Sequence, residues 1–209
     1  MARYLESSCR KCRRYGTKLF LKGDRCASEK CAFEKRKYAP GQHGNTGRRP
    51  KVTDFGIHLV EKQKAKFYYG LMERQFERYY VEASSQRKIP TGDRLVQLLE
   101  LRLDNVIYRL GIAPSRAMSR QIVLHRKVFV NGHYVNIPSY RVKTGDIITF
   151  KPELKENIYV KHSMERNVAI PEWLTFDPNS YRAEVTSMPD KANTNAPFND
   201  QLIVEFYSK

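Results

Sequence analysis

An Asn-Gly pair at positions 131–132 is the feature of this sequence that most constrains its fold. It stands inside the run 128–135, where apolar residues alternate with others, and Asn-Gly in that setting is the strongest short signal for a two-residue β-hairpin. A further strand is predicted at 147–150, after a turn at 143–146. The hairpin and this strand together predict a small, strongly bent sheet.

Two helices are expected just before this sheet. Apolar residues recur every three or four positions from Leu95 to Leu110, which predicts one amphipathic helix that ends near Gly111. Ser115 is a good N-cap for a second helix that reaches about His125. The central part of the chain is therefore interpreted as two helices followed by the sheet.

The second helix has a basic face. Arg116 and Arg120 stand four residues apart on it, with Gln121 beside them and Lys127 just beyond the helix end. A cation in the first turn of a helix is disfavoured by the helix dipole, so Arg116 suggests an external anion such as a phosphate. We expect this basic face to continue across the hairpin.

Positive charge is concentrated in two parts of the chain. The 209 residues contain 38 Lys and Arg against 22 Asp and Glu, a net charge of +16. Residues 1–51 carry +11 and residues 95–150 carry +5, whereas 52–94 carry +2 and 151–209 carry −2. Such an excess favours binding to a polyanion, because association releases the counterions condensed on phosphates. A generic basic protein would not show this clustering.

Four cysteines lie in one 23-residue window, with the spacing C-x2-C, thirteen residues, C-x4-C; they are Cys9, Cys12, Cys26 and Cys31. Two such pairs can complete a tetrahedral metal site, so we expect one structural Zn²⁺ ion, with an iron–sulfur cluster as the alternative. Residues 18–22 between the pairs are predicted to form a strand. The window is poor in apolar residues, and a metal would contribute about 10–16 kcal/mol to its folding.

Other uses of the cysteines fit the sequence less well. The N-terminus has no apolar stretch of a secretory signal, so the chain is expected in the reducing cytoplasm, where stable disulfides are not expected. A redox C-x2-C needs a βαβ context that the sequence does not indicate. No apolar run approaches the roughly 20 residues of a membrane span.

The segments between the cysteines and the central module are predicted as a loop and a helical region. Residues 36–51 are basic and rich in Gly and Pro, which is typical of a phosphate-contacting loop or of a flexible linker. From Thr53 to about Ser85 the apolar spacing is helical, with Thr53 or Asp54 as the cap. Its aromatic residues are interpreted mostly as core, and a boundary is predicted at 89–93.

Many motifs of the chain closely resemble one known family, that of the fourth protein of the bacterial small ribosomal subunit, which has an αL-type RNA-binding domain. They include residues 102–111, 115–116, 120–121, 125, 130–132, 137–140 and 145–146 in the central module, and 1–4, 38–44, 61–64, 73–76, 171–174 and 202–208 outside it. The chain departs from the family at 5–8, where Gly-Pro is usual. Many members lack the cysteines, so a metal site would mark a subset.

The resemblance implies an α+β fold with a metal-binding knob, a discontinuous helical domain and an inserted αL-type domain of two helices and a small bent β-sheet. The implied boundaries are an N-terminal extension at 1–44, the first helical part at 45–97, the αL-type domain at 98–165 and a return segment at 166–209 that packs on the helical domain.

The resemblance also implies a non-catalytic function in the cytoplasmic small ribosomal subunit. Members bind the 5′ domain of 16S rRNA as primary binders that nucleate assembly of the subunit body. They line the mRNA entry channel beside the third and fifth proteins of the subunit and influence translational accuracy, and some repress their own operon. We expect neither membrane contact nor a homo-oligomer.

The residues expected to contact RNA come from all basic segments. They are Arg3, Arg10, Arg13, Arg14, Lys22, Lys30, Arg36, Lys37, Gln42, His43, Arg48, Arg49, Lys51, Lys62, Lys64, Arg116, Arg120, Gln121, His125, Lys127, Asn131, Tyr140 and Arg141, with Arg48, Arg49 and Lys51 assigned to the channel. No catalytic residues are expected, because the five histidines are scattered and every cysteine belongs to the metal spacing. The rival hypotheses are an enzyme with this module as an appendage and a free-standing RNA-binding stress protein.

Overall fold

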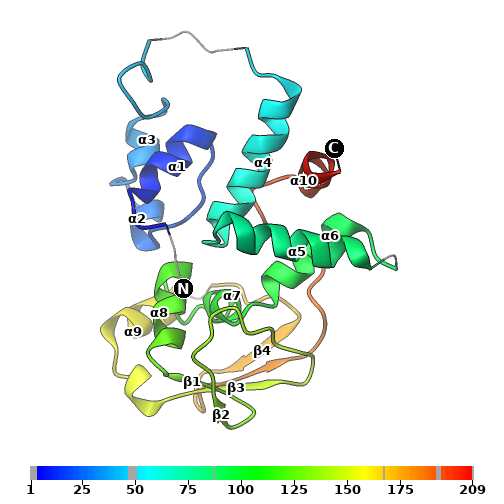
Figure 1. The fold of residues 1–209 in the computed structure, drawn as a ribbon. Helices are drawn as coiled ribbons and strands as arrows, with labels where there is room; N and C mark the ends of the chain where they lie inside the picture. Colours follow the sequence, from blue (N-terminus) through cyan, green and yellow to red (C-terminus); the bar gives the residue numbers. More distant parts are fainter. Residues whose placement is uncertain (1–3, 47–50, 87, 167, 192–193, 209) are drawn as a thin grey trace. The chain divides into compact units, whose positions relative to one another are not determined.

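The computed structural model describes residues 4–46, 51–86, 88–166, 168–191 and 194–208 (Figure 1). The chain divides into two compact units, of which the first is discontinuous: residues 1–95 with 196–209 form one unit, and residues 96–195 form the other. The first is helical and the second combines helices with an antiparallel sheet, so the α+β prediction is confirmed. Within the described residues, no helix has the length and apolar character needed to cross a membrane.

The first unit begins with what we call the cysteine segment, residues 4–46. It contains α1 (Ser8–Tyr15), α2 (Asp24–Ala27) and α3 (Ala32–Lys35). The strand predicted at 18–22 is wrong: Leu19 is fully buried, but Phe20 has a φ of 49°, which is incompatible with an extended strand. The three apolar residues of this run therefore belong to a turn in which Leu19 alone is fully buried.

The helical region at 53–85 is two helices, α4 (Asp54–Tyr68) and α5 (Glu73–Ser85). Thr53 caps α4 as predicted, because its hydroxyl accepts a hydrogen bond from the Gly56 N–H at 3.2 Å. The chain turns at Gly70, whose φ of 66° favours glycine and ends the helix. Buried aromatic residues, among them Tyr68 and Phe76, confirm that most aromatic side chains here are core.

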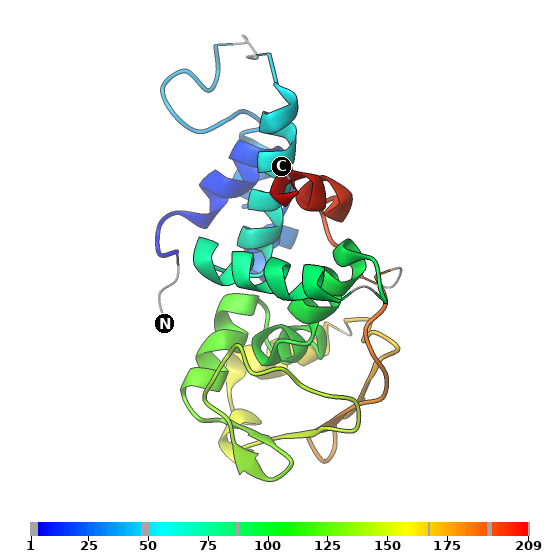
Figure 2. The same cartoon turned by 45° about the vertical axis from the view of Figure 1, so that its right-hand side comes forward.

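The C-terminal helix α10 (Asp200–Tyr207) completes the first unit by packing against α4 (Figure 2). Asn199 caps it, and the Asn199 N–H also donates to Glu61 of α4 at 2.9 Å. Aromatic rings continue the contact, since Tyr207 stacks on Tyr80 with ring centroids 4.4 Å apart. The chain therefore returns to its first unit only at its end.

The single helix predicted from Leu95 to Leu110 is broken into α6 (Thr91–Glu100) and α7 (Leu103–Arg109). The break has a tertiary cause, because the backbone at 101–104 pairs with residues 138–142. The Val142 N–H donates to Leu101 O at 3.0 Å, and the Leu103 N–H donates to Tyr140 O at 2.8 Å. These long-range hydrogen bonds replace helical ones. The spacing of apolar residues along the chain carries no information on such distant partners, so it could not predict the break.

Helix α8 (Arg116–Leu124) and the hairpin follow as predicted. The Ser115 hydroxyl accepts from the Met118 N–H at 3.4 Å. Strands β1 (Val128–Val130) and β2 (His133–Tyr134) are joined by Asn131 and Gly132, whose φ angles of 50° and 80° are those of a type I′ turn.

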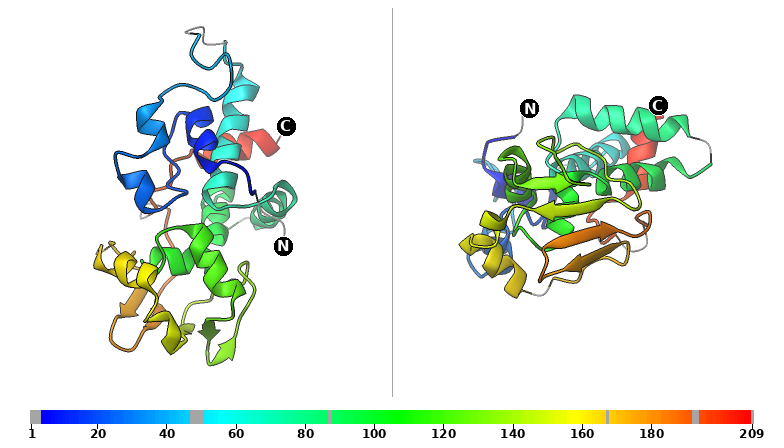
Figure 3. Two further views of the ribbon diagram at one scale, coloured as in Figure 1. Left: turned by 90° about the vertical axis from the view of Figure 1, so that its left-hand side faces the viewer. Right: turned by 90° about the horizontal axis from the view of Figure 1, so that it is seen from below.

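The sheet of the second unit has five strands in the order β2-β1-β3-β5-β4, with every neighbouring pair antiparallel (Figure 3, right). Strand β3 (Ile147–Phe150) is the predicted one, and it is followed by a 3₁₀ turn (Pro152–Leu154) and α9 (Ile158–Glu165). The remaining strands are β4 (Leu174–Asp177) and β5 (Arg182–Val185).

Strands β4 and β5 correct the predicted extent of the return segment. Residues 166–209 were expected to pack on the helical domain, but β5 pairs with β3, with Thr149 opposite Arg182. Ala183 and Val185 point inward from β5 and complete the core of the sheet unit. Only residues 196–209 belong to the first unit.

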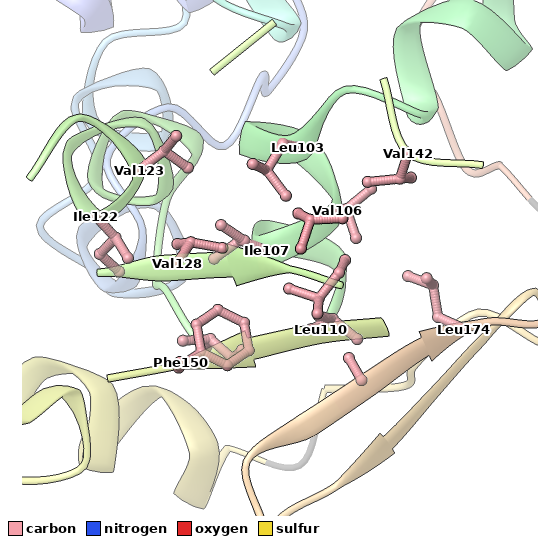
Figure 4. Packing of buried hydrophobic residues seen from close by; sticks show 14 of the residues in the cluster. Leu103, Val106, Ile107, Leu110, Ile122, Val123, Val128, Val142, Phe150 and Leu174 are labelled. Carbon is pink, nitrogen blue, oxygen red and sulfur yellow. The ribbon is translucent and has the colours of Figure 1, made fainter. Parts of the chain in front are cut away.

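One apolar cluster holds the sheet unit together (Figure 4). Helices α7 and α8 supply Leu103, Ile107 and Val123, which pack against Val128 of β1 and Phe150 of β3. Since successive strand residues face opposite sides, the inward direction of this set places Phe129, Thr149 and Arg182 on the other face of the sheet.

Candidate nucleic-acid interface

Most cations of the cysteine segment lie on its surface. The predicted RNA contacts that are exposed here are Arg10, Arg14, Lys22, Lys30, Arg36 and Lys37. Arg25 and Lys35 are equally exposed and extend this surface beyond the residues that the sequence predicts. A short segment with little core cannot turn its charges inward, so this part of the interface follows from composition.

Arg13 is held inside the cysteine segment, unlike the exposed cations around it. It is half-buried, and its guanidinium donates to Tyr38 O at 3.0 Å and to Ala39 O at 3.2 Å while lying 4.8 Å from the centre of the Tyr38 ring. It therefore ties the basic loop to α1. Gly44 tightens this loop, because a Cβ at that position would come within 1.9 Å of Ala39 O.

The rest of the basic loop is partly described. Gln42 and His43 are exposed, as is Lys51 just before α4. Arg3, Arg48 and Arg49 lie outside the described residues, so their predicted contacts stay predictions.

The four cysteines are free thiols. Cys9 and Cys12 lie three residues apart on α1, so both thiols come from one helix. Cys12, Cys26 and Cys31 are buried, and the Lys22 N–H donates to the sulfur of Cys26 at 3.3 Å. No group of three or more Cys, His, Asp or Glu side chains in the described ranges is arranged to hold a metal ion.

The thiols share one environment. Burial raises the pKa of Cys12 and of Cys26, and repulsion from the other nearby thiols raises both further. Each hydrogen bond from the backbone to these sulfurs lowers the pKa again. Buried thiols of raised pKa are poor nucleophiles, so the environment favours a structural role over a reactive one.

The two lysines that were expected to contact RNA from α4 are used within the protein. Lys62 is buried, and its ammonium contacts Glu73 at 2.5 Å, with Lys66 on the other Glu73 oxygen at 2.9 Å. Lys64 is largely covered and pairs with Glu61 at 2.6 Å. We therefore reassign Lys62 and Lys64 to the packing of α4.

Arg116 and Arg120 are the largest correction to the predicted interface, because both are buried. Arg116 donates from Nε to the Asn105 side-chain oxygen at 2.8 Å and lies over the ring of Tyr108. Arg120 contacts Asp104 at 3.4 Å. The partner of the first-turn cation is thus internal, and no phosphate is needed to explain it.

These arginines belong to a buried network between α6, α7 and α8. Asp104 also accepts two hydrogen bonds from Arg102, which is fully buried. Glu100 accepts from Asn105 at 2.7 Å and holds Arg109 through two hydrogen bonds at 2.8 and 2.7 Å. A buried ionic network of this kind stabilises one arrangement of helices when its members are satisfied.

The exposed cations of the sheet unit lie after α8. Gln121 and His125 are exposed and Lys127 is half-buried, as an interface requires. Arg126, which is not among the predicted contacts, is exposed in a left-handed conformation with a φ of 56°. Lys143 is also exposed.

The polar residues of the hairpin have structural uses. Asn131 donates to Asp146 and accepts from the Ile147 N–H, both at 2.9 Å. Tyr140 and Arg141 are half-buried in the segment that pairs with the helix break. These three residues shape the surface that the cations occupy.

Comparison with known proteins agrees with this architecture. Residues 3–100 match the family described as ribosomal protein S4/S9 N-terminal domain, and residues 101–148 match the S4 domain. The helices, hairpin and basic turn therefore define an S4-domain protein.

Whole-chain relatives identify the particular family. Proteins named small ribosomal subunit protein uS4 are 51% identical over 209 residues in Dictyoglomus turgidum, 48% over 211 residues in Magnetococcus marinus and 49% over 209 residues in Clostridium tetani, each covering all of both chains. The chain belongs to the uS4 family of small ribosomal subunit proteins.

Proposed function

We propose that the chain works by binding ribosomal RNA with two basic surfaces, one on the cysteine segment and one on the turn and hairpin after α8. It is a structural component of the cytoplasmic small ribosomal subunit, and its family is not one of enzymes. The observation that carries the RNA proposal is the distribution of exposed charge. Residues 125–145 contain exposed Arg126 and Lys143, half-buried Lys127 and Arg141, and no Asp or Glu, so their field attracts phosphate.

The finer assignment rests on the family resemblance. The RNA is the 5′ domain of 16S rRNA, and the chain binds it early, as a nucleus for assembly of the subunit body. The third and fifth proteins of the subunit are its neighbours. Lys51, which is exposed, supports a basic margin at the mRNA entry channel together with Arg48 and Arg49, and through this position the chain influences translational accuracy.

The four cysteines hold one structural metal ion in this proposal, with Zn²⁺ preferred and an iron–sulfur cluster as the alternative. Four thiols in one short segment match the ligand preference of both. Support comes from the burial of three of them and from the backbone N–H that bonds Cys26, an environment that suits sulfur ligands. Bound metal would deprotonate the thiols and stabilise a segment whose own core is small.

The RNA proposal is tested by the salt dependence of binding to small-subunit rRNA transcripts. Arg10 and Arg14 are exposed and four residues apart on α1, so changing both to Ala removes two phosphate contacts without removing a buried group. We expect weaker binding and a slope of log Kd against log salt that is smaller by about one per cation.

A matched control uses two other exposed arginines. Arg74 and Arg78 are also four residues apart, on α5, which lies outside both basic surfaces. Changing both to Ala removes the same charge, so affinity and slope should stay near those of the unaltered protein. Equal effects of the two double variants would show that only net charge matters and would contradict a defined surface.

A further inference from the structure

The outer side of the β1–β2 hairpin carries a stacked pair of aromatic rings. Phe129 and Tyr134 are directly opposite in the antiparallel register, with ring centroids 4.2 Å apart and planes at 30°. Val128 and Val130 point into the core, so Phe129 faces the other side. Tyr134 is 59% exposed, which leaves much of the ring accessible.

The charged side chains within residues 125–145, which include this pair, are all positive. Lys151 places its ammonium 5.4 Å from the centre of the Tyr134 ring. Exposed Arg126 lies before β1, and His133 lies beside Tyr134. Because residues 125–145 contain no acidic side chain, an anionic partner is favoured over a cationic one.

The hairpin holds these rings on a rigid support. Asn131 is bonded to Asp146, whose other oxygen accepts from the Lys143 N–H at 2.8 Å. The Asn131 N–H donates to Ile147 O at 2.8 Å, which joins the turn to β3. A preorganised aromatic surface loses little conformational entropy when a ligand stacks on it.

We propose that Tyr134, backed by Phe129, is a stacking platform for one unpaired nucleotide of the ribosomal RNA. An aromatic ring offers a flat apolar surface to a base, and the adjacent Lys151 is placed for the phosphate of the same strand. Only an unpaired base can stack in this way, because paired bases already stack on one another in the duplex. The inference rests on the proposed rRNA binding and adds the type of nucleotide that this surface takes.

A protein neighbour is the other class of occupant for an exposed aromatic pair. The RNA is favoured because cations lie beside the rings of the hairpin, while Ile158, the most exposed apolar side chain of the described residues at 79%, lies on α9. Binding of a protein here would leave rRNA affinity independent of Tyr134, so the same experiment separates the two.

The test measures binding of small-subunit rRNA transcripts to Tyr134→Ala. Loss of one stacked base predicts about tenfold weaker binding with an unchanged salt slope, because no charge is removed. Lys151→Ala should instead reduce the slope by about one. Tyr159→Ala is the matched control: Tyr159 is 67% exposed and lies on α9, so its removal should leave the affinity unchanged.

Fluorescence gives a second readout that a merely structural role would not produce. Tyr134→Trp keeps an aromatic platform, so it should retain affinity and show quenching on rRNA binding beyond that of the unaltered protein. Quenching in the unaltered protein should be small, because Trp173 is the one native tryptophan and is only 3% exposed.

The outcomes are distinguishable from failure of the proposed function. If the unaltered protein fails to bind rRNA, the RNA-binding function itself is wrong. If it binds, but Tyr134→Ala binds equally well and the Tyr134→Trp variant shows no extra quenching, the stacking platform alone is overturned. If Tyr134→Ala is weak only because it is unfolded, its circular dichroism will show that, and the quenching result decides.

Discussion

The cysteine segment and the sheet unit both carry excess positive charge, but they place it differently. In the cysteine segment most cations are exposed, while Lys11, Arg13 and Lys18 are half-buried. Lys11 lies over the Tyr4 and Phe67 rings, Arg13 donates to the Tyr38 and Ala39 carbonyls, and Lys18 pairs with Glu34. In the sheet unit four arginines are enclosed by Asp104, Glu100 and Asn105, and the exposed cations follow α8. Charge can be buried only where a core and matching carboxylates surround it.

The cysteine segment and the sheet unit also differ in what stabilises them. The sheet unit has a continuous apolar cluster, whereas the cysteine segment buries Leu19 and three cysteines. A region that lacks a core depends on a cross-link or a metal. The two regions should therefore respond to different perturbations.

The largest expected effect is on the cysteine segment alone. If the four cysteines hold the proposed metal ion, changing Cys9 and Cys12 to Ser should release about one equivalent of metal and unfold this segment, because such an ion would contribute about 10–16 kcal/mol. Elemental analysis gives the metal content, and hydrogen exchange should show lost protection at 8–35 with protection retained at 128–150. Ser28→Ala, at an exposed serine of the same segment, serves as control. An unchanged metal content in the double variant would refute the metal site.

The next largest effect is expected in the buried ionic network of the sheet unit. Asp104→Asn keeps the shape but removes the carboxylate that Arg102 and Arg120 share. We expect a loss of about 3–5 kcal/mol in the free energy of unfolding, because two buried guanidinium groups lose their anion. Urea denaturation measures it, with Glu153→Gln as an exposed control. A loss below about 1 kcal/mol would mean that the network contributes little to stability.

The smallest effect concerns acid stability of the first unit. Burial alone would raise the pKa of Glu73, but hydrogen bonds from Lys62 and Lys66 outweigh it and hold that pKa below its ordinary value. Folded protein then binds the proton less well than unfolded protein, so this contribution is present above about pH 4.5 and is lost as the pH falls through the folded pKa.

The Glu73→Gln variant tests this predicted loss of stability at low pH. It should lower stability at neutral pH by about 1 kcal/mol or less, since Glu73 is partly exposed and screened, and should flatten the acid loss of stability. Thermal unfolding between about pH 3 and pH 7 measures both, with Glu77→Gln on the same helix as control. Parallel pH profiles for the unaltered protein and the Glu73→Gln variant would contradict the assigned ion pairs.

Much of the fold could be predicted because its signals are local. The Asn-Gly turn, the Ser115 and Thr53 caps and the strand at 147–150 each depend on a few neighbouring residues. The break before Leu103 could not be predicted, because hydrogen bonds from residues 138–142 cause it. The pairing of β5 with β3 was missed for the same reason, since strand partners distant in sequence leave no local pattern.

By itself the sequence determined the hairpin, the capped helices, the excess of positive charge and the family resemblance. Only the tertiary structure decided which cations remain available to RNA. Arg116 and Arg126 are the same residue type in the same basic block, yet Arg116 is buried against Asn105 and Arg126 is exposed. The physical reason is that the burial of a charge depends on the groups that folding brings around it, and those groups come from other helices and strands.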